Sequence, residues 1–457
     1  MNFFIHHKTF LSCCVVSALA VSSAYAQFTF SGQLRTRSEY RNGQGTLLKE
    51  SDRAAFFTSQ RTRVSAAYSG YRIKAFATLQ DVRVWGQDAS TINRTTNADL
   101  NGLLLHEAWG EFSLLDTAQT KLGKELSLKI GRQELVYDDV RLLGNLDWLQ
   151  QGRRHDMALL KYGNKGWMLH AGVAYNQNRE LKSGTIYNGT PTGYTAGTNG
   201  IGTAYKSLQF AYLGKKFSAG SASFLIIKDD FNQYVTTPSS GTVAATRTYS
   251  DGTWSRVTLG SYVNATVKKL GVKAEAYYQT GRDKDGRTIS AYLLSGSLTY
   301  ATSQRTAITV GEDYTSGNEP GNATTSTNRR FDPLYGTPHK HWGYMDYFYV
   351  ADGFGVGGLS DFYLKVRYKP LDRLTMSLDF HQFASTNTIV GTDKIPLSKP
   401  SFGQEYDFIA QYAVTKQIGL EGGYSVFSAT DALAAAKAVS NADKSATWGY
   451  LMVNLKF

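Results

Sequence analysis

The sequence predicts an all-β protein: a single antiparallel up-and-down β-barrel of about 18 strands that spans a membrane. Three observations lead to this prediction. Segments of about ten residues, in which apolar and polar residues alternate, recur throughout the chain after residue 26. Short turns and long loops rich in Gly, Ser, Thr and Asn connect these segments alternately. The last segment, TWGYLMVNLKF, has an apolar face that ends in the terminal Phe457.

The first 26 residues have the organisation of a secretory signal peptide. A basic residue precedes an apolar stretch, and the small residues Ala24 and Ala26 follow it. We expect cleavage after Ala26, which would leave residues 27–457 as one barrel domain. Cleavage would also remove Cys13 and Cys14, so we expect no disulfide or thiol chemistry in the mature chain.

Composition supports a barrel and indicates an anionic partner. The chain contains 29 Tyr, 23 Phe and 44 Gly, and only 42% of its residues are hydrophobic. Abundant aromatic residues without long apolar runs are typical of a barrel, in which only every second residue faces lipid. The formal net charge is +12. Because an exported protein does not meet nucleic acid, we expect lipid headgroups, an acidic polysaccharide or small anions as partners.

The predicted strands cover the whole chain after residue 26. The clearest lie at 28–41, 55–68, 103–114, 167–178, 254–267, 271–279, 360–369, 402–414 and 446–457. Weaker ones lie at 72–87, 126–136, 153–162, 205–213, 217–230, 289–300, 305–314, 374–383 and 418–427. Helical periodicity occurs only around DALAAAKAV. The alternating connections predict short periplasmic turns and long extracellular loops, which a soluble β-sandwich would not require.

Strand phase predicts which charged residues face the lumen. In SGQLRTRSEYR, Arg35 and Arg37 lie on the face opposite Leu34 and Tyr40. The opposite phase would place arginines in hydrocarbon, at roughly 2–4 kcal/mol each near the midplane. The same reasoning directs further basic residues inward: Arg61, Arg63, Arg256, Lys365 and Arg367. Acidic residues also face inward: Glu107, Glu111, Asp379, Glu405, Asp407 and Glu421.

Two interpretations of this charged lining remain open, and both can hold in one barrel. Inward charges can pair with one another and brace the wall. Unpaired Arg and Lys can instead form a positive constriction that attracts an anion, because basic rings select anions in pores. The planar guanidinium group also matches the geometry of a carboxylate.

Two stretches resemble the alginate-export family of outer-membrane barrels. The first, KIGRQELVYDDVRLLGNLDWLQQGRRHD at 129–156, has a G-R-Q element followed by a tryptophan and a G-R element. The second, FDPLYGTPHKHWGYMDYFYV at 331–350, is similar to a family loop with His339 or His341, Gly343 and Asp346.

The resemblance implies a monomeric barrel in the bacterial outer membrane, with an electropositive constriction that passes an anionic polyuronate without energy input. It implies pore arginines at Arg132 and at Arg153 or Arg154. Nearby acidic residues fit counter-ions that hold arginine side chains in place: Glu107, Asp138, Asp139 and Asp156. We expect no cofactor, and we expect the terminal Phe457 to engage the barrel-assembly machinery.

Two alternatives to polyuronate export are a general anion or nutrient porin and a membrane-embedded hydrolase. The strand histidines have no recognisable nucleophile signature beside them: His106, His155, His170 and His381. We therefore expect a channel and not an enzyme.

Overall fold

The computed structural model describes residues 27–86, 103–177, 180, 182–184, 187, 205–239, 246–320, 327–348, 357–391 and 394–457. The predicted signal segment, 1–26, lies outside the described residues.

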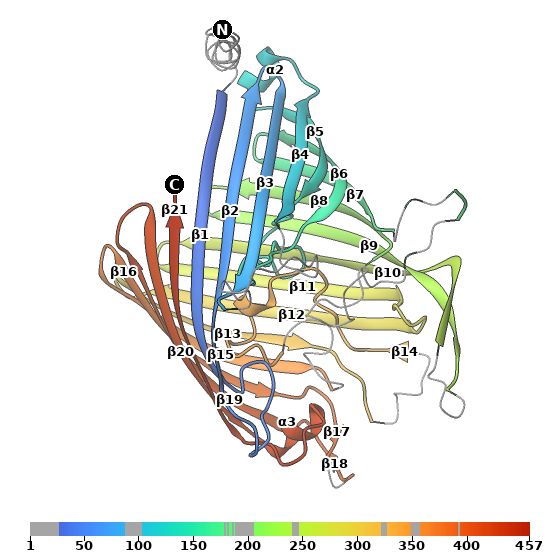
Figure 1. Cartoon of the computed structure of the whole chain (residues 1–457), viewed down its shortest axis with the longest axis vertical. Coiled ribbons are helices and arrows are strands. Elements are labelled where there is room, and N and C mark those ends of the chain that lie inside the picture. The colour runs from blue at the N-terminus through green and yellow to red at the C-terminus, as the bar shows by residue number, and fades with distance from the viewer. Residues whose placement is uncertain are drawn as a thin grey trace, which may run out of the picture.

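One closed antiparallel barrel of eighteen strands forms the molecule (Figure 1). Its first nine strands are β1 (Gln27–Asn42), β2 (Ala55–Gly70), β3 (Ile73–Val84), β4 (Leu104–Ser113), β5 (Glu125–Gln133), β6 (His155–Asn164), β7 (Trp167–Tyr175), β8 (Ser207–Phe217) and β9 (Gly220–Thr237). The other nine are β10 (Thr246–Val267), β11 (Leu270–Arg282), β12 (Thr288–Ala301), β13 (Thr306–Thr315), β15 (Leu359–Leu371), β16 (Leu374–Ala384), β19 (Ser401–Ala413), β20 (Ile418–Ala429) and β21 (Ser445–Lys456).

Short helices and strands lie in the connections between the barrel strands. They are α2 (Thr117–Lys121), β14 (Thr327–Asn328), η3 (Pro338–Lys340), β17 (Ile389–Val390), β18 (Pro396–Leu397) and α3 (Asp431–Ala436). The helical periodicity around residue 431 is therefore confirmed by α3, whose first turn is capped by the Thr430 hydroxyl. Figure 1 shows α2 and the start of β1 at one end, and α3, β17 and β18 at the other. None of the helices in the described residues is long and apolar enough to cross a membrane.

The barrel closes between its first and last strands. β1 pairs with β21 from Gln33 opposite Lys456 to Asn42 opposite Thr447. Beyond this register, the backbones of Gly32 and Phe457 exchange hydrogen bonds of 2.7 and 3.1 Å. A Cβ atom at Gly32 would lie 2.3 Å from the Phe457 ring. The terminal aromatic ring therefore fits at the seam only because residue 32 has no side chain.

Each of the predicted strands has a counterpart in the barrel, and their phase is confirmed. Phe28 and Phe30 are 65% and 73% exposed on the outer face, whereas Arg35 and Arg37 are each 3% exposed on the inner face. The main difference in length is at β9 and β10. Both continue into residues 231–253, which separate the predicted strands 217–230 and 254–267, with an irregularity in register between Tyr249 and Thr253.

The inner wall is apolar over β6 to β9. The inward side chains there are buried hydrophobic ones, including Leu159, Leu208, Phe210, Leu225 and Ile227. They belong to one buried cluster with loop residues such as Leu142, Leu143 and Phe331. The core of the protein therefore lies inside the barrel, where loop side chains pack against the wall.

Two long connections supply those loop residues. Loop A, residues 134–154, joins β5 to β6, and loop B, residues 331–348, lies between β14 and β15. The two loops are tied by a parallel bridge between Leu143 and Tyr335, with the Gly144 amide 2.9 Å from the Tyr335 carbonyl oxygen. Together they narrow the lumen.

Candidate functional site

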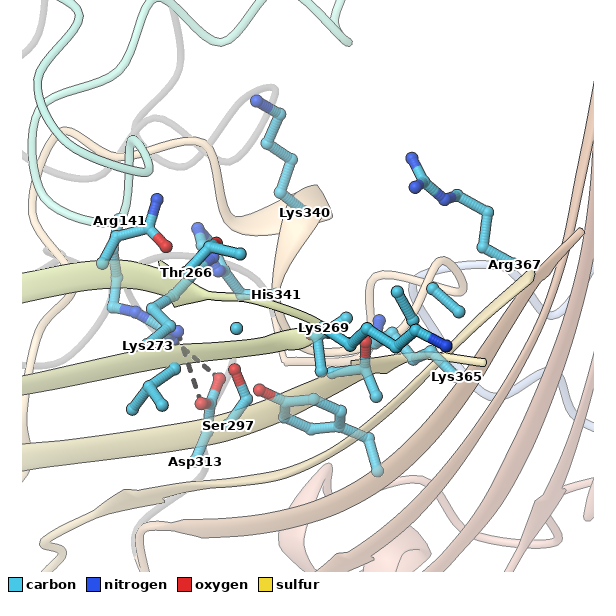
Figure 2. Close-up of a pocket in the computed structure, with 18 of the residues that line it drawn as sticks. Arg141, Thr266, Lys269, Lys273, Ser297, Asp313, Lys340, His341, Lys365 and Arg367 are labelled. Carbon is cyan, nitrogen blue, oxygen red and sulfur yellow. Dashed lines mark hydrogen bonds and ion pairs between the residues drawn. The ribbon is translucent and has the colours of Figure 1, made fainter. Parts of the chain in front are cut away.

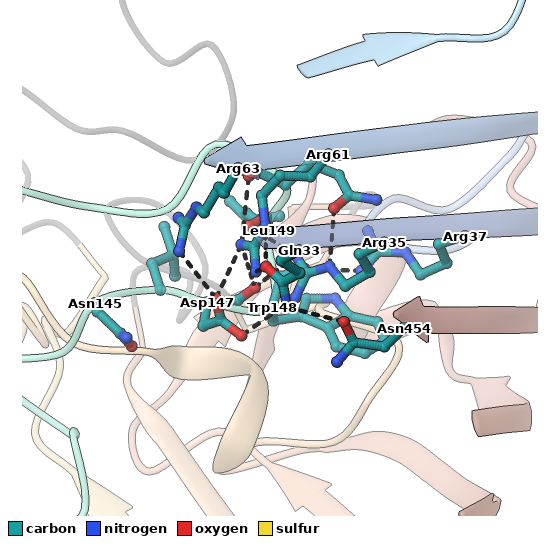
Figure 3. A network of polar contacts seen from close by, with 12 residues as sticks. Gln33, Arg35, Arg37, Arg61, Arg63, Asn145, Asp147, Trp148, Leu149 and Asn454 are labelled. Atoms are coloured by element: carbon teal, nitrogen blue, oxygen red, sulfur yellow. Dashed lines mark hydrogen bonds and ion pairs between the residues drawn. The ribbon is translucent and has the colours of Figure 1, made fainter. Parts of the chain in front are cut away.

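Three arginines of the wall converge on one carboxylate of loop A (Figure 3). Asp147 lies 3.2 Å from Arg35, 2.9 Å from Arg61 and 3.9 Å from Arg63. Arg35 also donates to the side chain of Gln150 at 3.0 Å and to the Asp147 carbonyl at 2.8 Å. The arginine row of β1 and β2 thus anchors loop A to the wall.

These guanidinium groups control the ionisation of Asp147. Burial alone would raise the pKa of this carboxyl group, because it disfavours the charged form. Arg61 and Arg35 outweigh burial and hold the pKa of Asp147 below its usual range. Asp147 therefore stays ionised at neutral pH and keeps its ion pairs.

A second anchor is a stack of rings next to this network. The Trp148 ring of loop A lies parallel to the His339 ring of loop B, with centroids 4.0 Å apart. The Arg37 guanidinium group lies 4.2 Å from the Trp148 ring centroid and donates to the Trp148 carbonyl at 2.8 Å. His339 pairs in turn with Asp346 at 2.8 Å. Cation–π and stacking contacts of this kind hold both loops in place.

Two further arginines connect the loops to the opposite wall. Arg141 of loop A reaches Glu275 at 3.1 Å and Asp313 at 2.7 Å. Arg256 of β10 pairs with Asp229 on the wall and with Asp332 of loop B, both at 2.5 Å. Each loop is therefore attached to the barrel by buried, charge-assisted hydrogen bonds.

A cavity of about 450 Å³ lies along the inner faces of β10 to β13 and β15 (Figure 2). Its basic lining residues are Arg141, Lys268, Lys269, Lys273, Lys340, Lys365 and Arg367. Among the described lining residues, Asp313 is the only acidic one, and Arg141 already pairs with it. The cavity therefore has a strong excess of positive charge.

Part of this charge has no counter-ion among the described residues. Lys365 pairs with Asp379 at 3.0 Å, and Lys273 lies 3.5 Å from Asp139. By contrast, Lys340 and Arg367 form no ion pair within the described part of the chain. His341 adds no charge at neutral pH, because burial, reinforced by Arg141, lowers its pKa to about 3.

The rest of the lining is neutral, and most of it is able to form hydrogen bonds. It includes Asn264, Thr266, Ser297, Thr299 and Thr309, with the ring of Tyr363 beside Lys365. A polar cavity with several cations can hold an anion that also carries hydroxyl groups. In the residues that the structure describes, no three His, Cys, Asp or Glu side chains converge as a metal ion would require.

Sequence comparison identifies the family. The family model described as alginate export matches residues 26–446. The chain belongs to the alginate export family. The family and the barrel fold place the protein in the bacterial outer membrane as a channel.

Solved structures of outer-membrane porins share the fold. A BenF-like porin from Pseudomonas fluorescens Pf-5 has a TM-score of 0.58 at 11% identity, covering 94% of this chain and 98% of that one. Pseudomonas aeruginosa OpdO has a TM-score of 0.56 at 14% identity, with coverages of 94% and 97%. Pseudomonas aeruginosa OpdK with vanillate has a TM-score of 0.54 at 11% identity, with coverages of 94% and 98%. No curated protein matches the chain in sequence.

The basic residues predicted from strand phase lie inside this alginate-export barrel. Arg35, Arg37, Arg61 and Arg63 contact loop A, and Arg256 contacts loop B. Lys365 and Arg367 line the cavity. Most of these cations therefore have partners, whereas Arg367 has none among the described residues.

The family-derived position Arg132 differs from this pattern. It shares the outer face of β5 with Ile130, which is 48% exposed, whereas the next residue, Gln133, is completely buried. Its guanidinium group pairs at 2.7 Å with Asp156, which is in phase with the exposed Leu160 of β6. The prediction that Arg132 lines the pore is therefore wrong, and Asp156 is its partner on the outer surface.

The other family-derived arginines lie where loop A enters β6. Arg153 donates to the Gly336 carbonyl of loop B, and Arg154 is half-buried next to β6. Arg153 thus connects the two loops.

The predicted counter-ions have varied partners. Asp138 accepts hydrogen bonds of 2.9 Å from Tyr212 and Ser223, so hydroxyl groups hold it instead of an arginine. Asp139 lies 3.3 Å from the Arg141 backbone amide and close to Lys273. Glu107 accepts from the Glu134 amide at 3.0 Å.

Sequence reasoning did not single out the residues that organise the loops. Asp147, Arg141 and Asp332 all lie in predicted loops, where strand phase gives no orientation. Strand phase places Lys273 on the inner face, opposite Val272, but its place in a basic cavity depends on Lys340 and Arg141 of the loops. An acid next to an aromatic residue inside a long connection, as in LDW, is the one signal that could have indicated Asp147.

Proposed function

We propose that the protein conducts an anionic polysaccharide of the polyuronate type across the outer membrane by passive diffusion. The observation that carries this proposal is the basic cavity, in which Lys340 and Arg367 have no counter-ion among the described residues. A positive field in a narrow lumen raises the local concentration of anions.

The chemistry of the lining fits a uronate better than a simple inorganic anion. Lysine and arginine bind the carboxylate group of each sugar residue. Side-chain hydroxyl groups such as those of Thr266, Ser297 and Thr309 provide hydrogen bonds for sugar hydroxyl groups. The cations of the strands lie on β11 and β15 and the hydroxyl groups on β10, β12 and β13, so both kinds of contact are available along one wall of the cavity.

The mechanism depends on several moderate sites instead of one tight site. Conduction requires binding that is strong enough for entry and weak enough for release. Lys273 lies on β11, and Lys365 and Arg367 lie two residues apart on β15, so a carboxylate can pass from one cation to the next. No step of this kind needs an energy source or a catalytic group, and we expect no enzymatic activity.

A second candidate is a porin for small organic anions. The volume of about 450 Å³ suits a small solute, and loops A and B narrow the lumen above the cavity. A polymer would require the loops to move, whereas a small anion would pass beside them. OpdK, one of the structural neighbours, was crystallised with vanillate, a small carboxylate.

Current block in planar bilayers separates the two candidates. Uronate oligomers of increasing length, added on one side, should interrupt the current for longer as their length increases. Neutral oligosaccharides of equal length should not. The variant K340Q/R367Q should shorten the interruptions, whereas R132Q, which changes an outer-surface arginine, should leave them unchanged. Block by uronate monomers alone would favour the small-anion porin, and no block by any uronate would refute both candidates.

A further inference from the structure

The barrel end that carries the short turns has an unusual charge distribution. Three of its turns contain an arginine that donates to a backbone carbonyl of the neighbouring turn or strand end. Arg72 donates to Ser113 at 2.9 Å, Arg373 donates to Val414 at 3.4 Å, and Arg305 reaches Pro370. These side chains connect neighbouring turns through hydrogen bonds.

The other short turns, or the strand ends that lead into them, carry lysines. We call this group the basic rim: Lys121, Lys165, Lys216, Lys268 and Lys416. All five side chains are exposed, and none forms an ion pair with a described residue. The rim therefore forms a ring of uncompensated positive charge around one end of the barrel.

Acidic residues at the same end are fewer than the basic ones, and one of them, Glu125, pairs with Lys161 at 3.2 Å. Asp116 accepts a hydrogen bond from the Gln119 amide at the start of α2, and Asp372 lies 3.9 Å from Arg305. At the opposite end, some charged side chains of the described loops pair with each other, as Arg287 with Asp283 at 3.2 Å and Lys444 with Asp431 at 2.7 Å, whereas Lys49, Lys394 and Lys399 have no ion pair with a described residue. The two ends therefore differ in their acidic residues, which accompany the lysines of the long loops, as Glu50, Asp52 and Asp443 do, and are few among the short turns.

Aromatic side chains place the rim at a membrane surface. Trp167 and Phe217 are exposed by 48% and 43% on the outer face next to the turns. Lys215, one residue before the rim's Lys216, lies over the Trp167 ring at 4.6 Å. Aromatic residues of this kind mark the level of the lipid headgroups. The ammonium groups of the neighbouring Lys165 and Lys216 then lie at the level of the phospholipid phosphates, whereas Lys268 also lines the cavity.

From this geometry we propose that the basic rim binds anionic phospholipid in the periplasmic leaflet of the outer membrane. Lysines near an anionic surface each strengthen association on the order of fivefold. A ring of them would select a shell of anionic lipid around the periplasmic mouth. The proposal concerns the outer rim and does not depend on what the lumen conducts.

Native mass spectrometry of the detergent-solubilised full barrel tests this inference. The probes are phosphatidylglycerol and phosphatidylcholine of identical chains in equal amounts. Wild-type protein should retain phosphatidylglycerol preferentially. The variant K121Q/K165Q/K216Q/K416Q should lose most of this preference, and the matched control K49Q/K394Q/K399Q/K444Q, at the opposite end, should keep it. Lys268 is left unchanged because it also lines the cavity.

Salt dependence provides a test that needs no variant. The preference of the wild-type protein should fall as ionic strength rises, because salt screens exposed charges. Equal retention of the two lipids by the wild-type protein, or an unchanged preference in the rim variant, would overturn the proposal. So would protection of the rim lysines from acylation by uronate oligomers but not by phosphatidylglycerol, which would assign the rim to the polysaccharide.

Discussion

Replacing Asp147 with Asn should release loop A from the barrel wall. The carboxylate is the shared partner of Arg35 and Arg61, whose side chains are 4% and 1% exposed, and it lies near Arg63. An amide of the same size keeps the packing but removes the negative charge. Arg35 and Arg61 would then lose their carboxylate partner, and Arg63 would keep only Glu134 at 3.6 Å.

The structure sets the size of this effect. Removing one partner of a fully buried ion pair costs about 3–5 kcal/mol. The Asp147 side chain is 50% exposed, so solvent screens the pairs and we reduce this figure to about 2 kcal/mol. Since about 1.4 kcal/mol corresponds to a factor of ten, the equilibrium between attached and detached loop should shift by a factor of roughly 30.

Single-channel recording in planar bilayers measures the shift. D147N should show more frequent openings and a larger mean conductance than wild type. Asp138→Asn is a matched control, because Asp138 lies in the same loop but is held by Tyr212 and Ser223. If D147N gates like wild type and like D138N, the arginine network does not hold the loop and the reasoning fails.

The remaining predictions concern pH, the outer surface and the seam. Because the pKa of Asp147 is depressed, its stabilisation of the attached loop is present above the ordinary aspartate pKa of about 3.9 and is lost as the pH falls through the lowered value. Channel opening should therefore stay constant from pH 8 to about pH 4 and increase in stronger acid. Increased opening already near pH 6 would contradict this. Anion selectivity should also be flat from pH 8 to about pH 5, since the pKa of His341 is lowered to about 3; a rise in anion selectivity near pH 6 would show that this histidine is charged. Arg132→Gln should leave the reversal potential unchanged, because the side chain lies on the outer face of β5 with Asp156. A shift of the selectivity toward cations would show that Arg132 lines the pore. Gly32→Val should lower the temperature at which the barrel unfolds in a heat-modifiability gel, because the new side chain would meet the Phe457 ring. Gly419→Val, in β20 with no atom within 4 Å of its Cβ position, should lower it less; equal melting of the two variants would exclude a role of the ring at the seam.

Alternating polarity was sufficient to predict the barrel, because lipid on one side and water on the other impose a period of two on every strand. The same physics oriented Arg35, Arg61 and Arg256 correctly. The alternation of polarity was a weaker signal for β8 and β9, where Phe210 and Ile227 are buried inside the barrel while Leu213 and Phe224 are exposed on its outer face. A strand that is apolar on both faces has no alternation, and only the folded loops explain why its inner face is apolar.

Arg132 shows the limit of transferring a motif without checking its phase. The residue follows Leu126, Leu128 and Ile130 at even spacing, so the strand pattern already favoured the outer face. The G-R-Q element suggested a pore role by resemblance alone. Where the two kinds of reasoning disagreed, the alternation was correct, because the apolar residues Leu126, Leu128 and Ile130 set the phase of the strand, and Arg132 follows that phase with Asp156 as its partner.

Loop contacts could not be predicted from the sequence. Asp147, Arg141 and Asp332 become counter-ions and anchors only because loops A and B turn into the lumen and meet side chains from strands far away in the chain. Strand periodicity ends where such loops begin. The basic cavity depends on the same contacts, since Lys340 and Arg141 reach it from the two loops.

The reversal potential across a bilayer with a KCl gradient tests the central claim, that the lumen is positive where solute passes. At low ionic strength, where screening is weak, wild-type channels should prefer chloride. K340Q/R367Q should reduce this preference, and K340E/R367E should reduce it further, while R132Q remains like wild type. A wild-type preference for potassium, or a selectivity that none of the cavity variants changes, would contradict the account.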